Sequence, residues 1–311
     1  MNFFNNLKIR NRSLYKRVFV TGATGFIGSA LVPELIDAGH QVIGLTRSDE
    51  GAKSLTAAGA QVHRGELTDL ESLRSGAAAA DAVIHTAFIH DFSKFKQNCE
   101  IDRRAIEAMG GVLAGSDRPL IVTSGLALLV QGRAATENDP PLPVSDSYPR
   151  ASEEAAAALE KRGVRAMVIR LPQVHDTVKQ GLVSYAIQLA RQKGVSAYIG
   201  EGQNHWSAAH RFDAAHLYRL ALEKGQAGER FHAVAEEGVL AREIAEAIGR
   251  GLNVPVVSLR PEEAAGHFGW LALFAGLDIT GSSAQTREKL GWNPTGPALL
   301  TDLANMRYVQ E

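Results

Sequence analysis

The sequence of 311 residues contains a single cysteine, Cys99, so no disulfide can form within the chain. It also has no apolar run that reaches the roughly 18 residues of a membrane-spanning helix. Neither sign of charge dominates, because 33 Lys and Arg stand against 34 Asp and Glu and the basic residues are scattered. We therefore expect a cytoplasmic protein that binds neither nucleic acid nor a membrane.

Hydrophobic residues make up 45% of the chain and charged residues 22%, which is enough apolar material for a packed core. The length exceeds that of most single cores. We expect a large domain over residues 17–172 and a smaller substrate lobe over 173–311, from which 228–235 returns to the sheet of the large domain. Residues 1–16, basic and without acids, faintly resemble a transit peptide. We favour an N-terminal extension outside the fold.

Short β-branched runs alternate with longer Ala-rich stretches up to about residue 170. This alternation is typical of βαβ units and predicts an α/β fold, a Rossmann-type doubly wound parallel sheet. The strands are expected at Arg17–Thr21, Gln41–Thr46, Gln61–Arg64, Ala82–Thr86, Leu120–Ser124 and Arg165–Arg170, with a later one within Arg230–Ala235. A helix is expected at Ile27–Ala38, ended by Gly39.

Three glycines at three-residue steps follow the first predicted strand, in the segment Thr21-Gly-Ala-Thr-Gly-Phe-Ile-Gly28. Gly22 permits a tight turn, Gly25 lets the backbone approach a pyrophosphate, and Gly28 lets the helix pack on the strand. The helix N-terminus then faces the phosphates. The sequence therefore predicts a dinucleotide site here, to which the intervening Thr24, Phe26 and Ile27 also contribute.

The end of the second strand selects between the two nicotinamide dinucleotides, because an acid there binds the ribose hydroxyl and repels a 2′-phosphate. The residues found are Leu45-Thr-Arg-Ser48, without an acid before Asp49. Arg47 could pair with a phosphate and Ser48 could donate to it, which favours NADP(H) over NAD(H). The alternative is that Arg47 is an ordinary solvated charge.

With these segments in hand, the chain resembles the short-chain dehydrogenase/reductase superfamily, on its extended or atypical side near the NAD-dependent epimerase/dehydratases. The resemblance covers most of the chain and implies three further cofactor-binding segments. They are Glu66-Leu67 beside the adenine, Thr86-Ala87 beside the ribose, and Pro172 with Val174 beside the nicotinamide.

The same resemblance implies a catalytic serine, Ser124, and a Tyr-x-x-x-Lys pair in which tyrosine passes the proton and lysine lowers its pKa. If Tyr148 is that tyrosine, the lysine position holds Ser152. In the other register the tyrosine position holds Pro149 and the lysine position Glu153. The lysine is absent in both, and Arg150 could supply the positive field instead.

We therefore expect an NADP(H)-dependent oxidoreductase that transfers hydride between nicotinamide and a small or apolar carbonyl-type substrate. Two alternatives stay open: a non-catalytic NADP(H) sensor, and an epimerase or dehydratase. The resemblance implies a homodimer, and no histidine spacing suits a metal site. His175 could replace the missing base, although packing explains it more simply. The apolar segment 267–274 predicts an amphipathic helix or a pocket wall.

Overall fold

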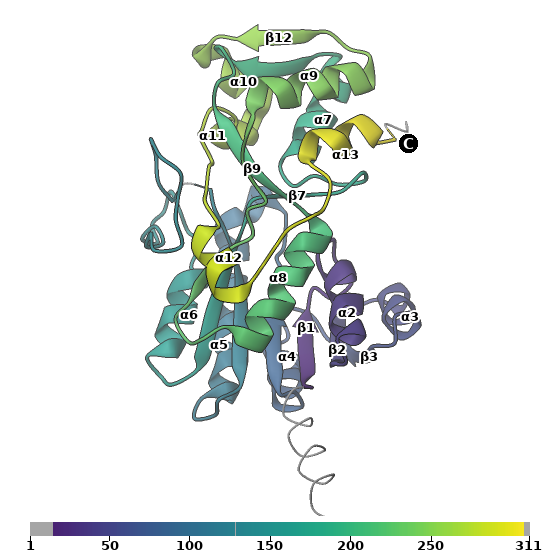
Figure 1. Cartoon of the computed structure of the whole chain (residues 1–311), viewed down its shortest axis with the longest axis vertical. Helices are drawn as coiled ribbons and strands as arrows, with labels where there is room; N and C mark the ends of the chain where they lie inside the picture. Colours follow the sequence, from purple (N-terminus) through teal and green to yellow (C-terminus); the bar gives the residue numbers. More distant parts are fainter. Residues whose placement is uncertain (1–14, 128, 308–311) are drawn as a thin grey trace, which may run out of the picture. The chain divides into compact units, whose positions relative to one another are not determined.

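The computed structural model describes residues 15–127 and 129–307, so the predicted N-terminal extension lies almost wholly outside the described residues. The chain folds into two compact units (Figure 1). The first comprises residues 1–124, 143–169 and 215–230, and the second comprises 125–142, 170–214 and 231–311. A single boundary at residue 172 does not describe this division, because the chain passes between the units several times.

The main sheet has seven strands in the order β10-β6-β5-β4-β1-β2-β3. Their bounds are β1 (Arg17–Thr21), β2 (Gln41–Thr46), β3 (Gln61–Arg64), β4 (Ala82–His85), β5 (Pro119–Gly125), β6 (Arg165–Leu171) and β10 (Arg230–His232). The pairs of β1 with β2 and β4, of β2 with β3 and of β4 with β5 are parallel. The strand order reverses between β1 and β4, which is where sheets of this kind bind their ligands.

Helices cover both faces of this sheet. On one face α4 (Leu70–Ala78), α5 (Phe95–Leu113) and α6 (Ser152–Glu160) pack side by side, and a single 3-10 turn, η1 (Phe92–Lys94), precedes α5. The other helices of the sheet are α2 (Gly28–Asp37), α3 (Asp49–Ala57) and α8 (Arg211–Lys224). Glu34 of α2 joins α8 by accepting from His216 Nδ1 at 2.8 Å and Arg219 Nε at 2.7 Å.

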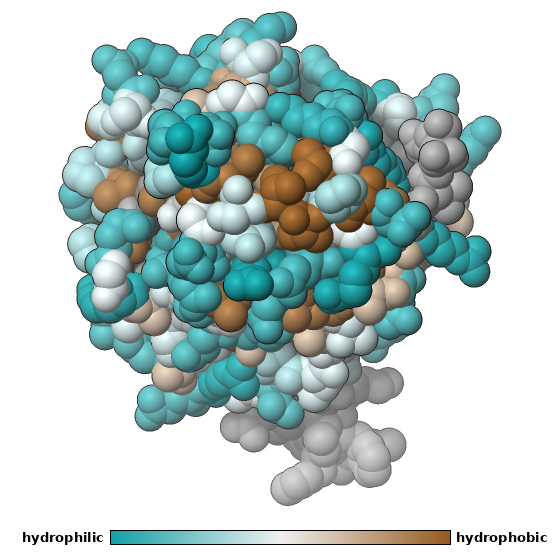
Figure 2. Space-filling view, turned by 90° about the horizontal axis from the view of Figure 1, so that it is seen from above, coloured by the Kyte–Doolittle hydropathy of each residue, from teal (hydrophilic) through white to brown (hydrophobic). Residues whose placement is uncertain are grey.

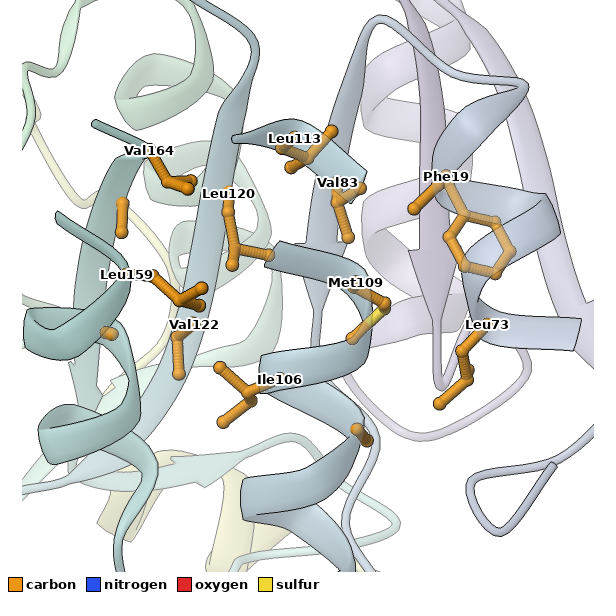
Figure 3. Close-up of a cluster of buried hydrophobic side chains, with 14 of the residues drawn as sticks. Phe19, Leu73, Val83, Ile106, Met109, Leu113, Leu120, Val122, Leu159 and Val164 are labelled. Atoms are coloured by element: carbon orange, nitrogen blue, oxygen red, sulfur yellow. The ribbon is translucent and has the colours of Figure 1, made fainter. Parts of the chain in front are cut away.

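The core beneath α4, α5 and α6 is apolar and closed to solvent. Figure 3 shows Ile106 and Met109 of α5 between Leu73 on one side and Leu159 on the other. Val83, Leu120 and Val122 of the strands belong to the same cluster and are drawn with them in Figure 3. Burying such side chains contributes about 1.5–3 kcal/mol each, so this core fixes the strands whose carboxyl ends carry the candidate site.

The second unit has two small sheets. One has the order β11-β9-β7, and the other is a parallel pair of β8 with β12. The bounds of the strands are β7 (Gln173–His175), β8 (Ser196–Ile199), β9 (His205–His210), β11 (Glu236–Leu240) and β12 (Val256–Leu259). Its helices are α7 (Val183–Lys193), α9 (Ala241–Leu252), α10 (Ala264–Phe268), α11 (Ala272–Ala275), α12 (Ala284–Leu290) and α13 (Leu299–Asn305), with the 3-10 turns η2 (Pro261–Glu263) and η3 (Gly269–Leu271).

The amphipathic helix expected over 267–274 is not continuous. Gly269 adopts a left-handed φ of 56°, which ends α10 and separates it from η3 and α11. Phe268 and Trp270 of this segment line a groove of about 360 Å³ with Tyr185 and Leu189 of α7. The face seen in Figure 2 gathers hydrophobic residues in one area bordered by hydrophilic ones. No helix within residues 15–127 and 129–307 is long and apolar enough to cross a membrane.

Candidate dinucleotide and catalytic site

The glycine segment forms a tight turn from β1 into α2. Gly22 has a left-handed φ of 69°, and its carbonyl accepts from Gly25 N at 2.9 Å. A Cβ on Gly28 would overlap that carbonyl, whereas a Cβ on Gly25 would meet only Gly22 and would otherwise point into open space. The turn therefore keeps a small cradle at the start of a helix, as a pyrophosphate requires. The residues present fit a dinucleotide.

The structure brings the glycine turn and Thr86-Ala87 together. A Cβ on Gly22 would lie 2.8 Å from both Ala87 N and Thr86 Oγ1. Thr86 Oγ1 donates to Thr21 O at 2.8 Å, so the ends of β1 and β4 are tied side by side. These predicted cofactor residues occupy the point at which the strand order reverses. Thr24 is exposed, while Phe26 and Ile27 are half-buried.

The residues predicted to select the dinucleotide follow β2. Ser48 caps α3, accepting from Gly51 N at 3.0 Å. Arg47 is exposed, and it forms no hydrogen bond or ion pair with any residue that the structure describes. Its neighbour Arg64, at the end of β3, is instead paired with Asp49 at 2.5 Å. Arg47 is thus the cation left available at this corner of the sheet.

The segment predicted to border the adenine follows β3. Glu66 is exposed and accepts from Thr68 Oγ1 at 2.7 Å. Leu67 is half-buried and packs against the core of the first unit. Asp69 caps α4 by accepting from Ser72 N at 3.1 Å. The segment therefore has local structural roles, which leave Glu66 facing solvent.

Ser124 stands near the carboxyl end of β5, which neighbours β4. The side chain is almost fully buried, yet its hydroxyl has no hydrogen-bond partner within the described part of the chain. The adjacent Thr123 is fully engaged: Oγ1 donates to His85 O at 2.7 Å and lies 2.6 Å from the Tyr218 hydroxyl. Burial raises the pKa of Tyr218 above its usual range. Ser124 is therefore a largely enclosed side chain whose hydroxyl is available to a ligand.

Tyr148 is half-buried in the segment before α6. Its backbone exchanges two hydrogen bonds with Ser145, at 2.9 and 3.1 Å. In the first register the lysine position holds Ser152, which is fully buried and donates to Asp102 Oδ2 at 2.6 Å. In the second register it holds Glu153, also buried, whose carboxylate lies 3.5 Å from Arg230 Nε. Both side chains have structural partners, and Arg150 is the cation of this segment.

A buried chain of polar groups, not anticipated from the sequence, runs from β1 to α6. Thr21 Oγ1 lies 2.7 Å from His85 Nδ1, and His85 Nε2 lies 3.0 Å from Asp102 Oδ1. Ser152 completes the chain on the second oxygen of Asp102. All four side chains are nearly inaccessible. The network anchors the start of α6, which directly follows the Tyr148–Arg150 segment. In the sequence, the only local indication of this network is a serine at the start of an Ala-rich helix.

The remaining predicted residues belong to the second unit. Pro172 is half-buried between β6 and β7, and Val174 is buried in β7 opposite Ala209. His175 is fully buried, and its Nδ1 lies 2.7 Å from Asp302 Oδ2. Burial lowers the pKa of His175, which the Asp302 carboxylate partly opposes. A packing role explains this enclosed histidine.

Comparisons with known proteins agree with this geometry. The model of the NAD dependent epimerase/dehydratase family matches residues 18–234. An uncharacterized protein of Schizosaccharomyces pombe is 49% identical over 298 residues, which cover 94% of this chain and 99% of that one. A decarboxylating sterol-4-alpha-carboxylate 3-dehydrogenase of Dictyostelium discoideum is 28% identical over 243 residues, 73% of this chain and 74% of that one.

Among solved structures, the dTDP-glucose 4,6-dehydratase DesIV of Streptomyces venezuelae, with NAD bound, is similar with a TM-score of 0.75. The match covers 94% of this chain and 95% of that one at 19% identity, and it supports the fold. The predicted Rossmann-type fold, the resemblance and the expectation of an NAD(P)-dependent enzyme of the oxidoreductase type are thereby confirmed. The chain belongs to the NAD-dependent epimerase/dehydratase family.

Proposed function

We propose that this protein is an NADP(H)-dependent oxidoreductase that transfers hydride between nicotinamide and a small or apolar carbonyl substrate. The observation that carries the proposal is the hydroxyl of Ser124 near the end of β5, which belongs to an almost fully buried side chain and has no hydrogen-bond partner among the described residues. Ser124 lies at the carboxyl ends of the strands, where the glycine turn and Thr86-Ala87 also lie. A free donor at this edge suits a carbonyl oxygen on which charge develops.

The bound cofactor supplies the hydride, so that the carbonyl carbon gains a hydride and the oxygen a proton. Ser124 donates a hydrogen bond to that oxygen and stabilises its growing negative charge. Tyr148 delivers the proton, with Arg150 as the nearby positive charge that replaces a lysine. Arg150 remains protonated, so it lowers the cost of the tyrosinate without relaying the proton further.

The apolar character of the substrate is supported by the segment after β4. Phe88, Phe92 and Phe95 are half-buried, and their rings pack at 5.8–6.2 Å between centroids. His90 adds edge contacts to the first two rings. An aromatic wall of this kind binds hydrocarbon surface and offers few groups to a sugar diphosphate.

The test is NADPH oxidation by the purified protein against a panel of aldehydes, ketones and oxo acids. We expect turnover with at least one class, and Ser124→Ala should lower it ~10²–10³-fold, as the loss of one oxyanion donor does. Tyr148→Phe should also lower turnover while NADPH binding is kept. Gly25→Val, whose side chain would occupy the cradle, serves as the control without cofactor binding.

Two outcomes would contradict the proposal. NADPH binding without turnover across the whole panel would favour the non-catalytic sensor. Substrate conversion without net consumption of NADPH, seen by product analysis, would favour an epimerase or dehydratase.

A further inference from the structure

Arg150 is a half-buried cation whose hydrogen-bonding capacity is nearly unused. Its Nε is enclosed and has no acceptor within the described residues, and its Nη2 has only Thr123 O at 3.5 Å. No carboxylate pairs with it in the described part of the chain. A guanidinium keeps its charge at every accessible pH, so this side chain retains an uncompensated charge in partial burial.

The other half-buried arginines of the first unit are each satisfied. Arg103, Arg219 and Arg230 pair with carboxylates. Arg118 donates to one side chain and three carbonyls, and Arg165 donates twice to Gly225 O. Five half-buried guanidinium groups of this unit therefore have carboxylate or carbonyl partners that offset their desolvation, and Arg150 does not. A bound anion would supply that partner to Arg150.

Asp102 is the acid near Arg150, and both of its carboxylate oxygens are already hydrogen-bonded to other residues. Asp102 and Arg150 both act on Cys99, whose pKa burial raises to about 11, so both charges lie in this neighbourhood. One oxygen of Asp102 is bonded to His85 and the other to Ser152, at 3.0 and 2.6 Å. The carboxylate thus bonds to α6 and leaves the guanidinium without an ion-pair partner among the described residues.

The Arg150 guanidinium lies near the carboxyl ends of β4 and β5, where the candidate site is. Its central carbon is 5.0 Å from the centroid of the Phe88 ring, in the segment after β4. Its Nη2 approaches the carbonyl of Thr123, the residue before Ser124 on β5. Stacking on an aromatic face holds the planar group while its in-plane donors stay free for a second ligand.

We propose that Arg150 binds a carboxylate of the substrate beside Ser124, and hence that the substrate is an apolar oxo acid. This inference rests on the proposed function, to which it adds the substrate class. A planar fork of donors matches a carboxylate in two parallel hydrogen bonds. With the Ser124 hydroxyl on the carbonyl oxygen, the carboxylate lies close to the reacting carbon, and the aromatic wall takes the hydrocarbon part.

The first experiment compares benzoylformate with its methyl ester, which lacks the negative charge, carries one additional methyl group and has the more electrophilic ketone. In NADPH-dependent reduction we expect kcat/KM for the acid to exceed that for the ester by at least about tenfold, the size of a charge-assisted pair. Arg150→Met should lower turnover of both compounds, because the positive charge beside Tyr148 is lost, and should abolish the preference between them, whereas Arg150→Lys should keep part of that preference. Arg104→Met, an exposed arginine of α5, is the matched control and should keep the whole preference.

The second experiment does not depend on turnover. Calorimetric titration of the protein–NADP⁺ complex should show benzoate binding more tightly than benzamide, with the difference lost in Arg150→Met and NADP⁺ affinity kept within about twofold. Equal binding of benzoate and benzamide would overturn the anion site. A large loss of NADP⁺ affinity in the variant would instead assign Arg150 to the cofactor phosphates. Benzoate binding without any turnover would leave the anion site standing while the proposed function fails.

Discussion

The glycines of the turn from β1 into α2 are required for different physical reasons. Gly28 is required by packing, since any Cβ there would overlap the carbonyl of Gly22. A Cβ on Gly25 would meet only Gly22, at 3.1 Å from its carbonyl oxygen, and would otherwise point into open space, where a ligand could approach the backbone. The regular spacing of the glycines therefore combines two requirements, helix packing at Gly28 and ligand approach at Gly25, and the requirement at Gly25 is the one that bears on phosphate binding.

The proposed preference for NADPH over NADH rests on Arg47. We predict that Arg47→Ala weakens NADPH binding by ~1.5–3 kcal/mol, the contribution of a hydrogen bond to a charged group. NADH, which lacks the 2′-phosphate, should bind with nearly unchanged affinity. Fluorescence titration of both dinucleotides measures this. Arg64→Ala is a matched control, because that guanidinium is already paired with Asp49. Equal affinities for NADPH and NADH in the unaltered protein would disprove the preference.

At the scale of elements, α6 owes its position to a polar contact as well as to its apolar face. Ser152 stands at the first turn of the helix and bonds to Asp102 in the interior of the unit. Leu159, at the other end, packs in the apolar core. The contact with Asp102 ties the first turn of α6 to α5, directly after the segment that carries Tyr148 and Arg150.

We predict that Ser152→Ala lowers the free energy of unfolding by about 1–3 kcal/mol, because a buried carboxylate oxygen loses its donor. Urea unfolding followed by far-UV circular dichroism measures the change. Ser75→Ala, at an exposed serine of α4, should change it by less than about 0.5 kcal/mol. A cost no greater than that of Ser75→Ala would mean that the Asp102 contact does not stabilise α6.

At the scale of the molecule, the two units can be followed separately. The three tryptophans, Trp206, Trp270 and Trp292, all belong to the second unit, so tryptophan fluorescence reports on that unit alone. Among the buried histidines of this unit, His175 has a pKa shift that gives the unit a distinct response to pH. His175 has Asp302 at 2.7 Å, Glu236 at 3.8 Å and His210 in ring contact.

Burial holds the pKa of His175 below its ordinary value, against the opposing charge of Asp302. The unfolded chain therefore takes up this proton first as the pH falls below about 6.5, and the free energy of unfolding decreases with falling pH. We predict that His175→Gln reduces this dependence by up to about 1.4 kcal/mol per pH unit between pH 7.5 and 5.5. Urea unfolding followed by tryptophan fluorescence measures both slopes; identical slopes would show that His175 does not titrate on unfolding.

The sequence by itself determined the strands, the glycine turn and the family, because alternating burial, helix periodicity and a turn that demands glycine are local properties of the chain. It also brought Arg47 and Ser124 to attention, since each follows from its place at the end of a strand. The helix predicted over 267–274 is divided at Gly269, whose φ is left-handed.

Tertiary structure alone decided which charges are compensated. Asp102 is 48 positions from Arg150 in the sequence, and the chain gives no sign that it is occupied by His85 and Ser152. Burial and partnership arise from residues that meet only after folding, such as Thr21 with His85 or His175 with Asp302. The free hydroxyl of Ser124 and the unpaired guanidinium of Arg150 are therefore visible only in the folded chain, because an unmet hydrogen bond is a property of surroundings and not of residue type.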